Sequence, residues 1–344
     1  MTPPRARARR LGCALAIGCA AAGCAPPAPR DPGPPPAASL HVTPLTDLAP
    51  AASLVWLLDV KPRALALDGR LAGPIGRVLP DERLRAFARS SGGVDLREVE
   101  ELTVAEYPSA TLLLARTFVD PARVEAAFRQ RAVTLEGRAV DGPPGDPRGD
   151  VTRLWGATAT GQEQVAVFGF EAVGVERGRF GPLRAAELFA QGKLKRASPA
   201  LRAPPLAHLA ELLGDADVRA FAPGPFTGEL ERAAGGLLAA TTAAGIGARS
   251  AAGPAGHGGV AFHVVLLGDW GADAAPAARR LRAVFDVTSG SDVGRLLGLD
   301  RCVAGPTVTG TPEALTVDFA LDADVLAGGL RAATGAEVSE IMAP

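Results

Sequence analysis

The alternation of apolar and polar positions predicts a series of strands and helices that begins near residue 53. Residues 53–60 (SLVWLLDV) form a continuous apolar run ended by charged residues and a proline, which favours a buried strand. A helical pattern covers residues 81–88, and a short turn separates two strand patterns at 99–106 and 111–118. These two strand patterns predict a β-hairpin.

A helix with a clear start follows the hairpin. Asp120 supplies a hydrogen-bond acceptor at the cap, and Pro121 has a preset φ that suits the first helical position. Val124, Ala127 and Phe128 then recur at helical spacing. They are expected to form the inward face of this helix.

The second half of the chain repeats this order. It offers a strand at 217–222, a helix at 228–244, a hairpin formed by 247–250 and 260–267, and a helix at 273–285. The stretches LLLARTFVDPARVEAAF and VVLLGDWGADAAPAARRLRAVF both run from a strand through a polar turn with Asp into an Ala-rich helix. We infer two related units of strand, helix, hairpin, helix and strand.

A last strand at 315–320 leads into a helix capped by Asp322, and its expected inward residues are Val325, Leu326, Leu330 and Ala333. This order of elements predicts the α+β class, with an antiparallel or mixed sheet and helices packed on one face. The first unit is assigned to residues 48–145 and the second to 205–344.

The intervening residues 146–204 are expected to be a strand-rich connector with a basic helix. Two strand patterns occupy 151–159 and 164–176. The stretch 138–150 is rich in Gly and Pro, which predicts a loop and the best boundary between units.

The first 23 residues have the order of an export signal. Four arginines precede an uncharged stretch of 13 residues at 11–23, which is shorter than the about 20 apolar residues of a membrane-spanning helix. Ala21, Ala22, Gly23 and Cys24 resemble the lipobox of bacterial lipoprotein precursors, although leucine is commonest where Ala21 stands. A weaker rival motif ends at Cys19, and an ordinary secretory leader cut near residues 22–25 is the alternative.

The lipoprotein resemblance implies that residues 1–23 are a signal peptide and that Cys24 carries a diacylglyceryl group and an acyl chain, such as palmitate, on its amine. Several acyl chains hold a protein on a membrane. Because Ala25 rather than Asp follows the cysteine, the resemblance favours the outer membrane over the inner membrane of the cell envelope. Residues 24–47 then form a Pro- and Ala-rich tether.

Charge and cysteine content narrow the function classes. Without the leader the chain has 32 basic and 37 acidic side chains, a net charge of −5. Binding to nucleic acid is therefore not expected, because it depends on basic surface. Cys302 is the one cysteine left outside the leader and the lipidation site, and it is interpreted as a small buried apolar residue.

Known catalytic and metal-binding motifs do not occur in the sequence. There is no HExxH, GxSxG, Walker or GxGxxG motif, and Asp322 with Asp324 fits a helix cap better than a calcium loop. The carboxylates at 95–101 are interpreted as a solvated strand edge. No catalytic residue, metal site or cofactor is predicted.

Two features stand out as candidate contacts. Residues 176–202 have a local charge of +5 and include Arg177, Arg179, Arg184, Lys193, Lys195 and Arg196. Such a stretch suits anionic lipid headgroups or an acidic protein partner, and the alternative is a solvated helix face rich in Arg through codon bias. The loop at 221–229 presents Phe226, either as a contact for a partner or ligand or as a hydrophobic staple.

Together these features favour a lipid-anchored envelope protein with a non-catalytic binding or assembly role. A first alternative is a periplasm-facing carrier of lipid or another amphiphile, which requires a large apolar cavity between sheet and helices. A second alternative is a hydrolase without a known motif, and its best candidate base is His263 in a polar cleft beside an acid.

Overall fold

The computed structural model describes residues 40–142, 147–179, 181–232, 234–253 and 258–334. All of them belong to one compact unit, residues 37–344. The predicted signal peptide, Cys24 and residues 25–39 of the predicted tether lie outside the described residues. The prediction that the tether extends to residue 47 is wrong, because Val42 and Leu45 are 3% and 0% exposed and pack in the core.

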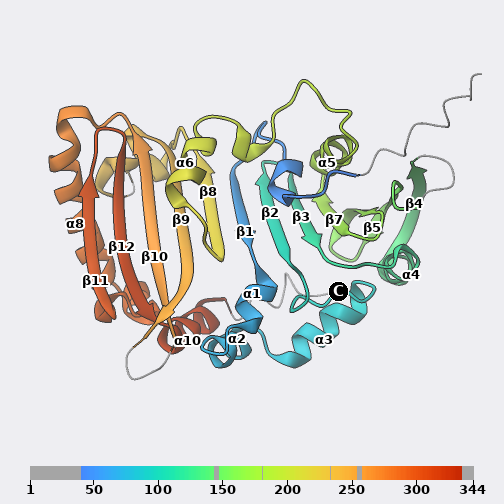
Figure 1. Ribbon diagram of the computed structural model, residues 1–344, viewed down its shortest axis with the longest axis horizontal. Helices are drawn as coiled ribbons and strands as arrows, with labels where there is room; N and C mark the ends of the chain where they lie inside the picture. The colour runs from blue at the N-terminus through green and yellow to red at the C-terminus, as the bar shows by residue number, and fades with distance from the viewer. Residues whose placement is uncertain (1–39, 143–146, 180, 233, 254–257, 335–344) are drawn as a thin grey trace, which may run out of the picture. The chain divides into compact units, whose positions relative to one another are not determined.

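The core of this unit is a single antiparallel sheet of twelve strands (Figure 1). The strand order is β11-β12-β10-β9-β8-β1-β2-β3-β7-β6-β5-β4. The bounds are β1 Trp56–Val60, β2 Glu101–Tyr107, β3 Ala110–Arg116, β4 Ala132–Asp141, β5 Val151–Thr158, β6 Gly161–Phe168, β7 Ala172–Gly178, β8 Val218–Pro223, β9 Thr241–Ala252, β10 Gly258–Gly268, β11 Ala304–Gly310 and β12 Ala314–Asp322. The predicted α+β class and antiparallel pairing are confirmed.

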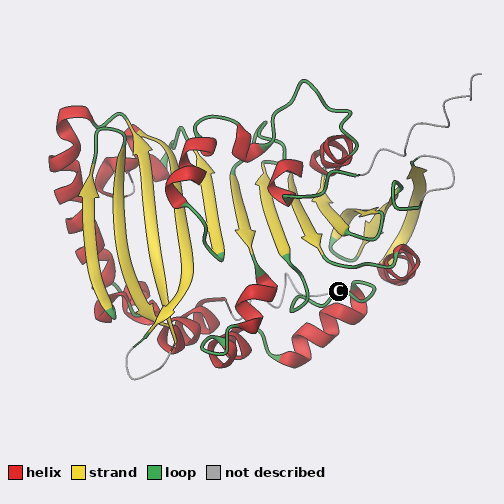
Figure 2. Cartoon of the chain, in the orientation of Figure 1, coloured by secondary structure: helices red, strands yellow, loops and turns green. Residues whose placement is uncertain are grey.

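Helices and 3₁₀ turns make up most of the rest (Figure 2). The α-helices are α1 Pro62–Leu67, α2 Ala72–Val78, α3 Asp81–Ser90, α4 Pro121–Arg131, α5 Pro182–Ala190, α6 Leu206–Leu213, α7 Glu229–Arg232, α8 Ala274–Ser289, α9 Asp292–Leu297 and α10 Ala323–Thr334. The 3₁₀ turns are η1 Leu45–Leu48, η2 Ala200–Arg202, η3 Ala234–Ala240, η5 Gly271–Asp273 and η6 Leu299–Arg301.

The prediction that helices pack on one face of the sheet is wrong. On β6, Val165 packs in a cluster with Phe128 of α4, whereas the next residue, Ala166, packs in a cluster with Leu183 of α5. Successive strand residues point to opposite faces. Helices α4 and α5 therefore cover opposite faces of the sheet. Both faces of β6 are apolar, so each can pack against a helix.

The predicted helix starts are confirmed. The Asp120 carboxylate accepts a hydrogen bond from the Ala122 N–H at 2.9 Å, and α4 buries Val124, Ala127 and Phe128. Likewise, the Asp322 carboxylate accepts from the first backbone N–H groups of α10.

The helix predicted at 228–244 is wrong beyond its first turns. Gly235 and Gly236 have φ values of 65° and 82° and interrupt the helical path. The Ala-rich residues that follow enter β9, where pairing with β8 and β10 outweighs the helix preference of alanine.

The loop and unit boundary predicted at 138–150 also need correction. Residues as far as Asp141 belong to β4, which pairs with β5 across the expected boundary. The pattern at 164–176 predicts one strand, but Gly169, with a φ of 56°, turns the chain between β6 and β7.

Candidate functional site

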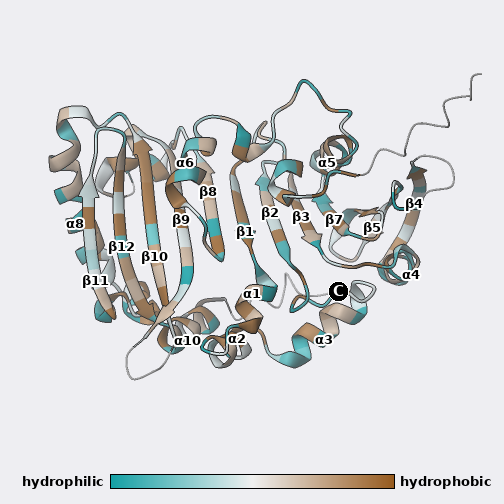
Figure 3. Cartoon of the chain, in the orientation of Figure 1, coloured by the Kyte–Doolittle hydropathy of each residue, from teal (hydrophilic) through white to brown (hydrophobic). Residues whose placement is uncertain are grey.

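An apolar pocket lies between the sheet and four helices, and it is called here the main pocket. Its volume is about 560 Å³, within the about 300–1,000 Å³ typical of ligand sites. Figure 3 shows the hydrophobic character of β10, one of the strands that form its wall. The lining includes Ile246, Ala248, Phe262 and Leu321 from the sheet, Ile75, Val78, Leu297, Leu326 and Leu330 from the helices, and Leu71 from the turn just before α2.

The sheet wall of the main pocket follows from alternation along β9. Ile246 and Ala248 face the pocket, while Gly245 lies on the other face against α6. A side chain at Gly245 would come within 2.8 Å of Leu213 Cδ1. The pattern of glycine and apolar residues therefore lets α6 approach one face closely and leaves an apolar surface on the other.

The helix wall is held by specific contacts. Gly329 brings α10 against α9, since a Cβ there would lie 2.3 Å from the Leu296 carbonyl oxygen. Arg77 of α2 forms an ion pair with Asp324 at the start of α10. These contacts hold α2, α9 and α10 around the pocket.

The residues predicted to lie inside on α10 only partly do so. Leu326 and Leu330 line the main pocket, and Leu330 is 36% exposed. Ala333 is exposed. The apolar stripe of α10 therefore faces open space as well as packed side chains.

Polar groups are scarce in this pocket. Among the described lining residues, only Arg249 and Ser250 have polar side chains, and Arg249 is exposed. The main pocket can therefore accommodate hydrocarbon, whereas a polar ligand group placed deep inside would lose its hydrogen bonds to water.

A polar cleft of about 420 Å³ involves His263 and Asp318 on neighbouring strands. His263 Nδ1 lies 2.7 Å from Asp318 Oδ1. In the described part of the chain, no hydroxyl or thiol hydrogen-bonds to His263, and the Asp318 side chain is 53% exposed. The cleft has a base and an acid but lacks an aligned nucleophile.

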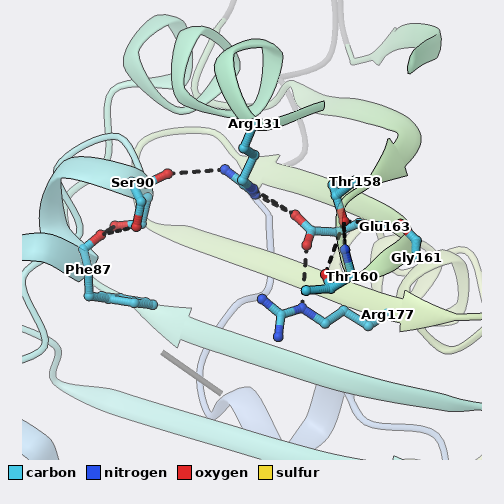
Figure 4. Close-up of polar contacts among 9 residues, drawn as sticks. Phe87, Ser90, Arg131, Thr158, Thr160, Gly161, Glu163 and Arg177 are labelled. Carbon is cyan, nitrogen blue, oxygen red and sulfur yellow. Dashed lines mark hydrogen bonds and ion pairs between the residues drawn. The ribbon is translucent and has the colours of Figure 1, made fainter. Parts of the chain in front are cut away.

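A second apolar pocket, called here the small pocket, has a volume of about 230 Å³. It lies among β2, β3, β6, β7, α3 and α4, and includes Arg131, Glu163 and Arg177 in its lining. Figure 4 shows Glu163 between the two arginines. Arg131 Nε donates to Glu163 Oε1 at 3.0 Å, and Arg177 Nε lies 3.4 Å from Glu163 Oε2.

The predicted basic stretch does not form one surface. Arg177 pairs with Glu163, whereas Arg184 of α5 pairs with Asp141 and Glu187. Helix α5 contains no other basic residue, so the predicted basic helix is wrong. The remaining four residues are exposed and lie in connecting segments outside α5: Arg179, Lys193, Lys195 and Arg196.

Phe226 is half-buried in the segment between β8 and α7. It lines none of the three pockets described above. Cys302 is also partly buried, its thiol donates to the Leu299 carbonyl oxygen at 3.3 Å, and burial raises its pKa.

The sequence patterns locate neither apolar pocket, although the carrier alternative requires a cavity of this kind. The sequence predicts the apolar face of α10 through Leu326 and Leu330. It also contains the apolar residues Ile75 and Val78 of α2, but no helix was predicted there. Glu163 was missed as well, although it is the charged residue of β6, where it lies between two glutamines just before the apolar residues 165–168.

Comparison of the chain with protein-family models, curated proteins and solved structures finds no match. Within the described ranges, no helix combines the length and hydrophobicity needed to cross a bilayer. The same ranges contain no group of three or more His, Cys, Asp or Glu residues arranged to hold a metal ion.

Proposed function

We propose that this protein is a lipid-anchored envelope carrier that holds the hydrocarbon part of an amphiphile in the main pocket. The observation that carries the proposal is an apolar space of about 560 Å³ between sheet and helices. In this proposal the ligand's head group stays at the rim near Arg249, and its chain lies along Ile246 and Phe262.

The energetics favour hydrocarbon as the occupant. Each buried methylene group contributes about 0.8 kcal/mol, and among the described lining residues only the side chains of Arg249 and Ser250 offer a partner to a polar group. A ligand with one apolar chain and one polar end therefore fits this pocket better than a uniformly polar ligand.

The location is part of the proposal. Its support is the resemblance of residues 21–24 to the lipobox, followed by the Pro-rich tether. An anchored carrier would stay beside the membrane from which an amphiphile comes, with the outer membrane favoured.

We also propose that the two halves are related units. In the first, β1, β2 and β3 pair in order, α4 follows, and β7 returns to pair with β3. In the second, β8, β9 and β10 pair in order, α8 follows, and β12 returns to pair with β10. The small pocket lies on β2, β3 and β7 and the main pocket on β9, β10 and β12, so they occupy corresponding strands.

A pocket-filling substitution tests the carrier function. Ala248→Phe places a ring inside the main pocket, whereas Ala252→Phe adds the same ring at an exposed position of the same strand. The protein from residue 25 onward retains the whole compact unit 37–344. We expect Ala248→Phe to weaken binding of the uncharged fluorescent probe N-phenyl-1-naphthylamine at least about tenfold, equivalent to about 1.4 kcal/mol.

Ala252→Phe should bind the probe as the parent does. Urea denaturation identifies any variant that is simply unfolded. A folded Ala248→Phe variant with parental affinity would contradict the proposed carrier function.

A further inference from the structure

The small pocket joins an apolar space to a cluster of charges, and this combination points to a ligand. We propose that it binds a medium-chain carboxylate, with the chain in the apolar part and the carboxylate on the guanidinium of Arg177. The proposal concerns a site separate from the main pocket and does not depend on the carrier function proposed there.

The apolar part of the small pocket accommodates the chain. Its walls include Leu102 and Val104 of β2, Leu113 of β3, Val175 of β7 and Phe87 of α3. The volume of about 230 Å³ lies below the about 300–1,000 Å³ of drug-sized sites. A shorter chain than that of the main pocket's ligand therefore fits.

The charges at this pocket do not balance. The Glu163 side chain is 2% exposed and is shared by two guanidinium groups, those of Arg131 and Arg177. Two positive charges against one negative charge leave an excess of one positive charge. The Arg177 side chain is 38% exposed, so an anion from solvent can reach its guanidinium and compensate that excess.

Arg131 and Arg177 differ in the donors they have left. Arg131 gives two N–H groups to Glu163 and one to the Ser90 carbonyl oxygen, at 3.2 Å. Arg177 uses Nε for Glu163, and its two terminal amino groups have no partner among the described residues. Figure 4 shows its guanidinium extending past Glu163 toward the side where Phe87 lies.

This geometry suits a carboxylate. The planar fork of an arginine offers parallel N–H groups that match the two oxygens of a carboxylate. The nearby Glu106 carboxylate, in the same row of the sheet, accepts from the Thr111 hydroxyl at 2.7 Å. Among the described residues of this row, Arg177 is therefore the one whose N–H groups can still donate to a ligand.

The test compares two ligands of equal chain length, decanoate and decanol. We expect the parent protein to bind decanoate at least about tenfold more tightly than decanol. Arg177→Gln should remove this preference, and Arg177→Lys should retain part of it, because lysine keeps the charge without the fork. Arg179→Gln changes the next basic residue, which is exposed and outside the pocket lining, and should behave as the parent.

Two further variants separate this site from the main pocket. Val104→Trp fills the small pocket without changing its charged residues and should remove the preference for decanoate over decanol, while Ala248→Phe should leave that preference unchanged. The inference is overturned if the parent shows no preference for decanoate, or if folded Arg177→Gln keeps it. If Ala248→Phe alone removes the preference, the carboxylate is recognised at the main pocket, which also overturns the inference but leaves the carrier function standing.

Discussion

At the scale of single residues, buried carboxylates are the feature that sequence patterns described least well. Glu101, Glu176 and Glu187 are each at most 9% exposed. Glu176 accepts the Gly181 and Leu183 N–H groups at the start of α5, at 2.8 and 2.7 Å. Burial raises the pKa of all three carboxyl groups.

The acidic stretch at 95–101 shows why sequence patterns describe buried carboxylates poorly. It was interpreted as a solvated strand edge, but β2 lies between β1 and β3 in the middle of the sheet. Glu101 therefore points into the core, where its Oε1 accepts from the Leu45 N–H at 2.8 Å. Asp95 and Glu100 do pair with surface arginines, so the interpretation was right for those residues.

Glu101 should make stability depend on pH. Burial and then the charge of Asp59 raise its folded pKa above the ordinary value of 4.5. A raised carboxyl pKa contributes stability that is fully present below the unfolded pKa and is lost as pH rises through the folded pKa. We expect the free energy of unfolding to fall more between pH 4.5 and 7 in the parent than in Glu101→Gln.

The glutamine keeps an oxygen for the Leu45 N–H and removes the charge together with the ion pair to Arg116, whose Nε lies 3.4 Å from Glu101 Oε2. Urea unfolding at several pH values measures the difference. Identical pH profiles for the two proteins would show that the buried carboxyl does not titrate in this range.

At the scale of elements, the sequence correctly predicted features whose hydrogen-bonding partner lies only a few residues away. The caps Asp120 and Asp322 were predicted because a carboxylate reaches N–H groups only two or three residues away. By contrast, β4 was missed because it is an edge strand whose burial pattern is mostly exposed, so it lacks a clear alternation.

Removal of the α10 cap should affect both stability and the main pocket. Asp322 Oδ1 accepts from the Asp324 and Val325 N–H groups at 2.9 and 3.0 Å. We expect Asp322→Ala to lower the free energy of unfolding by about 1 kcal/mol and to weaken probe binding, since Leu326 lines the pocket. Urea unfolding and probe titration measure the two effects.

Asp120→Ala is the matched control, because it removes the cap of a helix that does not line the main pocket. It should lose similar stability and keep probe binding. If both variants bind the probe equally well, α10 does not need its cap to form the pocket wall.

At the scale of the whole molecule, pairing between β1 and β8 joins the two halves into one sheet. Asp59 and Arg219 face each other across this junction, and Arg219 Nη2 donates to Asp59 Oδ2 at 2.6 Å. Asp59 is 3% exposed, and its Oδ1 has no hydrogen-bond partner among the described residues. The junction therefore depends on a buried ion pair.

Breaking this pair from one side should be costly. Arg219→Met leaves a buried carboxylate without its counter-charge, which destabilises proteins by about 3–5 kcal/mol. The double variant Asp59→Asn with Arg219→Met removes the charge as well and should recover part of the loss. Urea denaturation of the parent, both single variants and the double variant measures the coupling, and a loss below about 1 kcal/mol in Arg219→Met would contradict a structural role for the pair.

Local patterns in the chain were enough to predict the α+β class, most strands, the helix caps, and an export leader ending at Cys24. These depend on periodicity and on partners a few residues apart. The faces that the helices cover, the spaces left between them, and the contact of Glu163 with Arg131, 32 residues away in the chain, emerge only once the chain is folded. The reason is physical: a pocket or a buried charge cluster is defined by distant segments packed together, and no single stretch of sequence carries that arrangement.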